Sequence, residues 1–194
     1  QVSVDGKTYI LNQPFIVFAT QNPVEHEGTF PLPEAQLDRF MIRLSMGYPG
    51  IMAELDMLER LRLSHPIENL KPVTDPQTIV QMQMKVREIF VHPKVREYML
   101  RVIARTRDHA HVLLGASPRA SLMLFRCCQG YAAVLGRGYV IPDDVKALIS
   151  PVLEHRLILN PESRLRKVTI SSVIKEILNE IPVPSASVNQ WKTP

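Results

Sequence analysis

A short apolar run near the amino terminus, FIVFAT at residues 15–20, constrains the fold of this chain more than any other stretch. The run is too short for a helix, it is rich in β-branched and aromatic residues, and polar residues do not alternate with the apolar ones. Such a run is typical of a strand that is covered on both faces, as in a parallel α/β sheet. We therefore expect a buried central strand at 15–20.

The residues that follow this run supply a first candidate for ligand binding. In Gln21-Asn22-Pro23 the proline disfavours the α conformation at Asn22 and holds it extended. Ligands of open α/β sheets bind at the carboxyl ends of the strands, where an amide can orient a water or a phosphate oxygen without adding charge. The alternative is that Asn22 only hydrogen-bonds its own turn, as Asn before a loop commonly does.

A second candidate, Arg39, lies on a short helix that Pro33 can open at its first position. We expect Leu37 and Phe40 to anchor this helix to the core, and Asp38 and Arg39 to project from its opposite side. Arg39 would then present an exposed guanidinium near the carboxyl edge of the sheet. A surface salt bridge is the ordinary alternative for such an arginine.

The third candidate is Arg119, at the start of another helix. Ser117 as N-cap and Pro118 at the first helical position place Arg119 in the first turn. The backbone N–H groups and the helix dipole favour an anion there, so a cation opposes the dipole. A visiting phosphate would explain the arginine, although an exposed arginine costs only about a few tenths of a kcal/mol in that place.

Three segments carry a resemblance to a known family. ATQNP at 19–23, EHEGTFPLPEAQLDRF at 25–40 and GASPRA at 115–120 resemble the second half of a MoxR-type AAA+ ATPase module. The resemblance extends over about residues 1–184, which is nearly the whole chain.

This resemblance implies a P-loop machine that hydrolyses ATP in a ring, usually a hexamer, and uses the cycle to remodel or activate partner proteins in the manner of a chaperone. By position in the motifs, Asn22 matches the sensor 1 residue of the family and Arg39 its arginine finger. Arg119 matches the sensor 2 arginine, which contacts the nucleotide.

One departure from the family pattern concerns the nucleotide grip. The sequence contains no G-x-x-x-x-G-K-[ST] and no apolar strand ending in Asp-Glu, which are the phosphate cradle and the magnesium-binding carboxylates. It also begins at Gln1 without a methionine. We therefore interpret the chain as the carboxyl-terminal portion of a longer protein. ATP and Mg²⁺ are expected for that complete protein, whereas this chain alone should bind neither tightly and should not hydrolyse ATP.

The expected fold is the α/β remnant of a P-loop AAA+ core, with a hairpin and parallel strands, followed by an all-α helical lid domain. An Asp5-Gly6 turn signal predicts the hairpin, and helical periodicity with proline at helix starts predicts the lid. The expected organisation is the α/β core at 1–50, a connector helix and linker at 51–73, the lid with sensor 2 at 74–184, and a flexible tail at 185–194.

Composition narrows the possible partners. The formal net charge is +4, but the basic residues are dispersed and few stand beside aromatics, so we do not expect nucleic acid binding. No apolar run approaches the roughly 18 residues of a membrane span. The adjacent Cys127 and Cys128 can form neither a routine disulfide nor a two-arm metal clip, and His109 with His111 does not make a metal-ligand pattern. We therefore predict no metal site in this chain, and buried thiols in a reducing cytoplasm.

Two classes of function fit these observations. The first is a motor in which Asn22, Arg39 and Arg119 sense and stabilise the γ-phosphate of ATP while the ring acts on a client protein. The second is a non-catalytic helical module that only recruits a protein partner. Phosphate-binding motifs upstream in the parent protein would decide for the first class.

Overall fold

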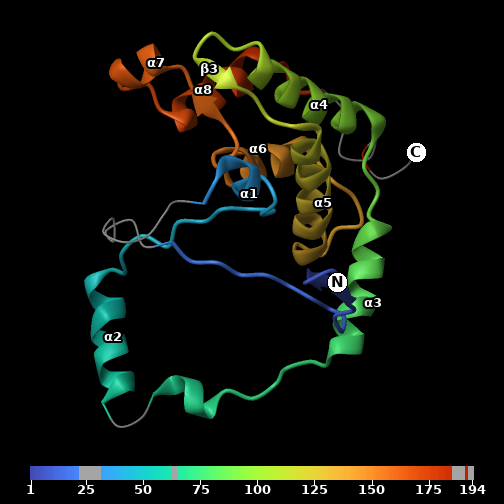
Figure 1. Cartoon of the computed structure of the whole chain (residues 1–194), viewed down its shortest axis with the longest axis vertical. Coiled ribbons are helices and arrows are strands. Elements are labelled where there is room, and N and C mark those ends of the chain that lie inside the picture. The colour runs from blue at the N-terminus through green and yellow to red at the C-terminus, as the bar shows by residue number, and fades with distance from the viewer. Residues whose placement is uncertain (22–31, 63–64, 185–190, 192–194) are drawn as a thin grey trace. The chain divides into compact units, whose positions relative to one another are not determined.

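Two compact units make up the chain, whose residues 1–21, 32–62, 65–184 and 191 are described in a computed structural model (Figure 1). The first unit comprises residues 1–20 and 44–83, and the second comprises residues 21–43 and 84–194. We call the second the helical unit, because it contains most of the long helices. The segment around α1 (Glu34–Leu37), which the sequence places with the α/β core, clusters here with the helical unit.

The first unit begins with the predicted hairpin. β1 (Val2–Val4) pairs antiparallel with β2 (Lys7–Tyr9). The two turn residues, Asp5 and Gly6, have φ angles of 49° and 75°, as a type I′ turn requires. The hairpin prediction is therefore confirmed. The unit continues with α2 (Ile51–Leu61), the 3₁₀ turn η1 (Pro66–Asn69) and most of α3 (Pro76–Arg87).

The expected central strand is not observed. Residues 15–20 have no strand assignment, and the Phe18 side chain is 90% exposed. The alternating pattern of residues 41–45 also predicts a strand, which is likewise absent. A strand requires a neighbouring strand that satisfies its backbone N–H and C=O groups, and within the described residues no strand pairs with either segment. The apolar sequence of 15–20 is therefore typical of a buried strand, but neither of the two small sheets of the described chain includes it.

Proline opens each of the principal helices of the helical unit except the last, because the first position has no intrahelical use for a backbone N–H. The elements are α4 (Pro93–Arg107), β3 (Val112–Leu114), α5 (Pro118–Val134), α6 (Pro142–Leu153), β4 (Ile158–Leu159), α7 (Pro161–Leu165) and α8 (Ile170–Glu180). β3 and β4 form a short antiparallel pair. The predicted helical lid is thus present.

The core of the helical unit lies where α4, α5, α6 and α8 meet. Tyr98, Ile103, Leu124, Ile149 and Ile177 are among its largest fully buried side chains. Each apolar side chain of this size contributes about 1.5–3 kcal/mol when it is removed from water. This core holds the start of α5 and the end of α6 in fixed positions, and both carry residues of the candidate site.

The two cysteines of α5 are free thiols. Cys128 is buried and Cys127 is partly buried, and burial raises the pKa of the Cys127 thiol to about 11. Both thiols are therefore protonated and unreactive at neutral pH. In the described part of the chain, no helix combines the length and the apolar character that crossing a bilayer would need.

Trp191 does not behave as part of a flexible tail. Its side chain is only 4% exposed and belongs to the core of the helical unit. The indole lies edge-on to the His92 ring at the start of α4, with 5.3 Å between the ring centroids. The prediction of a flexible tail is thus wrong for this residue, because the apolar indole ring of Trp191 is buried in the core of the helical unit. The other residues of 185–194 lie outside the described part of the chain.

Candidate functional site

Arg39 lies directly after the single turn of α1. Pro33 is the N-cap of this turn rather than its first helical residue. The Arg39 backbone N–H donates to the Gln36 carbonyl over 3.1 Å. The Arg39 side chain is exposed, as predicted. Among the described residues, no side chain or backbone group forms a hydrogen bond or an ion pair with its guanidinium.

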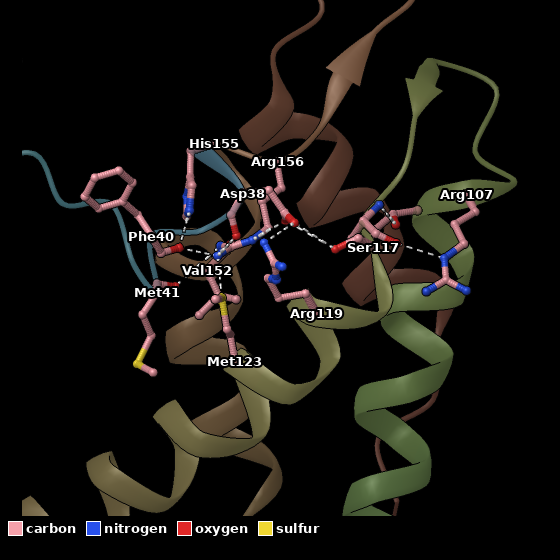
Figure 2. Close-up of polar contacts among 12 residues, drawn as sticks. Asp38, Phe40, Met41, Arg107, Ser117, Arg119, Met123, Val152, His155 and Arg156 are labelled. Carbon is pink, nitrogen blue, oxygen red and sulfur yellow. Dashed lines mark hydrogen bonds and ion pairs between the residues drawn. The ribbon is translucent and has the colours of Figure 1, made fainter. Parts of the chain in front are cut away.

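Asp38, in contrast, points into the helical unit, which corrects the prediction that it projects away with Arg39. Its carboxylate accepts hydrogen bonds from the Ser117 hydroxyl, at 3.2 Å to each oxygen, and from Arg156 Nε at 3.1 Å (Figure 2). Arg119 Nη1 lies 3.6 Å from the same carboxylate. The sequence prediction failed here because the partners of Asp38 are about 80 and 120 residues away along the chain.

Arg156 is the most buried charged group of this cluster, with a side chain that is 1% exposed. Its Nη2 donates to the Asp38 carbonyl over 3.2 Å and also to the Phe40 carbonyl, and its Nη1 donates to the Val152 carbonyl. Burial lowers the pKa of this guanidinium from its ordinary value, and the Asp38 carboxylate opposes that shift. A buried charge is tolerated when each of its donors has a partner, and this arrangement supplies them.

The segment that follows Arg39 is bound to the carboxyl end of α6. The Arg43 backbone N–H donates to the Pro151 carbonyl over 2.9 Å, which provides a partner for one of the carbonyl groups that a helix end leaves free. His155 Nε2 lies 3.1 Å from the Phe40 carbonyl. Burial lowers the pKa of His155, so the ring is neutral at physiological pH and Nε2 carries the proton of this hydrogen bond. These contacts fix the backbone on the carboxyl side of Arg39.

Arg119 lies in the first turn of α5, as predicted, and its side chain is 50% exposed. Ser117 is the N-cap, but its hydroxyl makes no capping bond and is directed to Asp38 instead. The Asp38 carboxylate therefore stands near the amino end of α5, where it offsets the charge of Arg119. The unfavourable position of this arginine, which suggested a visiting phosphate, is thus partly explained by a carboxylate of the chain itself.

A close backbone approach determines where α5 begins. A Cβ atom on Gly115 would lie 2.6 Å from the Arg107 Cα of α4, so glycine is required at this position. Arg107 Nε also donates to the Ala116 carbonyl over 2.9 Å (Figure 2). The GASPRA segment is therefore packed tightly against α4, which holds Ser117 and Arg119 beside Asp38.

Of the three predicted site residues, Arg119 is paired with the residue that directly precedes Arg39. Arg39 follows Asp38 in the chain, and Asp38 is paired with Arg119. Asn22 lies outside the described residues. The sequence reasoning missed Asp38 and Arg156 as members of the cluster. A signal for Arg156 existed, because it stands among the apolar residues of the 152–159 stretch, and an arginine in such surroundings is seldom buried without a partner.

The described residues offer no metal centre. No group of three or more His, Cys, Asp or Glu within them could hold an ion. His111 Nδ1 lies 3.0 Å from the Ser163 hydroxyl, and His109 Nε2 lies 3.4 Å from Glu176. These histidines therefore have contacts within the helical unit. The described residues do not fit the Mg²⁺ ion that a P-loop ATPase uses.

Two segments of the chain, and its fold, match known AAA proteins. Residues 104–177 match the AAA lid domain, and residues 1–42 match the ATPase family associated with various cellular activities (AAA). A crystal structure from Cytophaga hutchinsonii, described as a candidate ATPase, superposes with a TM-score of 0.88 at 30% identity, over 95% of this chain and 58% of that one. The fold is therefore that of a partial AAA+ core with its helical lid.

Curated proteins are similar to this chain over nearly its whole length. The chain is 45% identical to protein YeaC of Bacillus subtilis, over 94% of this chain and 57% of the relative. It is 36% identical to chaperone MoxR1 of Mycobacterium tuberculosis, over 96% of this chain and 51% of the relative. These similarities confirm the resemblance to MoxR-type AAA+ ATPases found in the motifs. The chain spans about half the length of these relatives.

Proposed function

We propose that the complete parent protein is a cytoplasmic AAA+ ATPase that hydrolyses ATP in a ring, by family resemblance a hexamer, and uses the cycle to remodel or activate a client protein. This chain would supply Asn22 as sensor 1, Arg39 as the arginine finger and Arg119 as sensor 2. The supporting observation is the Asp38 cluster: Asp38 pairs with the half-exposed Arg119, and the residue directly after Asp38 is Arg39, which is exposed and has no partner among the described residues.

The proposed chemistry is electrostatic. Negative charge on the γ-phosphoryl group shifts in the transition state, and a guanidinium held at the right place stabilises that charge without moving. Arg39 would act on the nucleotide of a neighbouring subunit, and Arg119 would bind the phosphates. The Asn22 amide would orient the attacking water. Mg²⁺ would be held by residues outside the described part of this chain.

A comparison of ATP turnover by the parent protein and by this chain alone tests the proposal. The parent should hydrolyse ATP, and residues 1–194 alone should show no turnover above a buffer control, because the phosphate-binding motif is not in this sequence. Release of labelled phosphate is the measurement. A parent without ATPase activity would favour the second class, a helical protein-interaction module. Turnover by the isolated chain would contradict our assignment of the phosphate-binding parts.

Replacement of the proposed sensor 1 should separate binding from hydrolysis. In the parent protein, Asn22→Ala should leave ATP affinity nearly unchanged and slow turnover by about 10²-fold, because a misplaced water reacts slowly although the nucleotide is bound. Asn69→Ala, which makes the same change on the exposed turn η1, is the matched control and should do neither. Loss of ATP binding with unchanged turnover per bound nucleotide would show that the role of Asn22 is misassigned.

A further inference from the structure

One buried guanidinium holds the backbone on both sides of Arg39. Arg156 Nη2 donates to the carbonyl of Asp38, directly before Arg39, and to the carbonyl of Phe40, directly after it. Arg156 Nε binds the Asp38 carboxylate at the same time (Figure 2). Arg39 is therefore the exposed residue between two residues whose carbonyl groups are both bound by a single side chain.

A fixed backbone matters for an arginine that stabilises a transition state. A long arginine side chain stabilises developing charge only if its backbone already points it at the right place, and a misplacement of about 1 Å can cost 10²-fold in rate. We propose that Arg156 is a positioning residue for Arg39, and that it fixes the direction of the arginine finger by clamping residues 38–40 to the end of α6. This inference rests on the proposed role of Arg39.

The geometry requires an arginine at position 156. The planar guanidinium presents several N–H donors in a fixed fork, so it can bind a carboxylate and two carbonyl groups of one segment at once. A lysine ammonium carries the same charge on a flexible stem and cannot reproduce this pattern. Arg156→Lys therefore retains the buried positive charge near Asp38 but loosens the clamp.

A second buried ion pair of the helical unit provides a matched control. Arg137 binds both Asp144 oxygens, over 2.9 and 2.5 Å, and the Asp144 side chain is 3% exposed. Arg137 also donates to the Tyr139 carbonyl over 3.0 Å. This pair lies at the amino end of α6, whereas the Arg156 clamp lies at its carboxyl end. Arg137→Lys should thus disturb a comparable structural contact and leave Arg39 alone.

The test compares these two lysine variants in the complete parent protein. Arg156→Lys should lower kcat for ATP by about 10-fold to 10²-fold, with the Kd for ATP changed less than about threefold. Arg137→Lys should lower the melting temperature about as much as Arg156→Lys does. It should leave kcat within about twofold of the value for the unsubstituted protein. In an Arg39→Ala background, Arg156→Lys should cause no further loss of kcat, because two residues that act through one contact are not additive.

Specific outcomes would overturn the inference. Equal losses of kcat in the two lysine variants would show that Arg156 has only a structural role. The same conclusion would follow if Arg156→Lys retained full kcat while Arg39→Ala was inactive, and the proposed function would then stand without this inference. An active Arg39→Ala variant would instead remove the proposed function itself. If Arg156→Lys does not fold, Asp38→Ala removes the carboxylate that Arg156 Nε binds, and unchanged kcat in that variant would overturn the inference.

Discussion

In the complete parent protein, Arg39→Ala should lower the rate of ATP hydrolysis by about 10³-fold or more, while the affinity for ATP changes little. An arginine finger contributes this much to phosphoryl transfer because it neutralises charge that develops only in the transition state. The exposed Arg39 guanidinium has no partner in the described part of the chain, so its removal should not disturb the fold. The loss should therefore appear in kcat alone.

Arg43→Ala is the matched control for this variant. Arg43 is an exposed arginine of the same segment, and its backbone bond to Pro151 is retained by alanine. Steady-state turnover and equilibrium ATP binding should be measured on both variants. A loss of turnover in Arg43→Ala equal to that in Arg39→Ala would mean that any cation of this segment suffices. A loss of ATP affinity in Arg39→Ala would show that Arg39 binds nucleotide in the ground state.

The second large effect concerns stability. Arg156→Met in residues 1–194 should reduce the free energy of unfolding of the helical unit by about 3 kcal/mol, because it removes the Arg156 donors from the Asp38 carboxylate and from two carbonyl groups. We expect the lower end of the range for broken buried pairs, since the Asp38 side chain keeps 25% exposure. Arg156→Met should also release Asp38 from the end of α6.

The fluorescence of the single tryptophan of the chain can be used to measure unfolding of the helical unit. Trp191 is buried in the core of the helical unit, so its fluorescence should follow unfolding in urea. Arg101→Met is the control, because Arg101 pairs with Glu97 on the surface of α4 with a side chain that is 61% exposed. Exposed pairs of this kind contribute about 0.5 kcal/mol or less. Equal urea midpoints for the two methionine variants would mean that the Arg156 clamp does not stabilise the fold.

Local sequence rules predicted those parts of the structure that depend on few neighbours. Asp5 and Gly6 adopt the positive φ angles of the predicted turn, and Pro76, Pro93 and Pro118 begin helices as expected. These features depend on φ preferences and missing N–H groups, which residues carry with them. The exposure of Arg39 and the place of Arg119 in a first helical turn followed from the same rules.

Features that depend on distant partners could not be predicted in this way. The apolar run at 15–20 has the composition of a buried strand, but no described segment pairs with it. The direction of Asp38 is set by Ser117 and Arg156, which sequence spacing cannot relate to it. Trp191 was expected in a flexible tail, yet it is buried beside His92. In each case the outcome depends on the presence or absence of a partner that is distant in the sequence.

The central claim is that Arg39 acts on the nucleotide of a neighbouring subunit, and mixing two inactive variants of the parent tests it most directly. One variant carries Arg39→Ala, and the other lacks the lysine of the phosphate-binding loop that we expect upstream, so that it binds no nucleotide but retains Arg39. In a preparation shown to exchange subunits, ATP hydrolysis should partly return, because some Arg39→Ala subunits receive Arg39 from a neighbour. A mixing titration that stays flat at every ratio would contradict the claim.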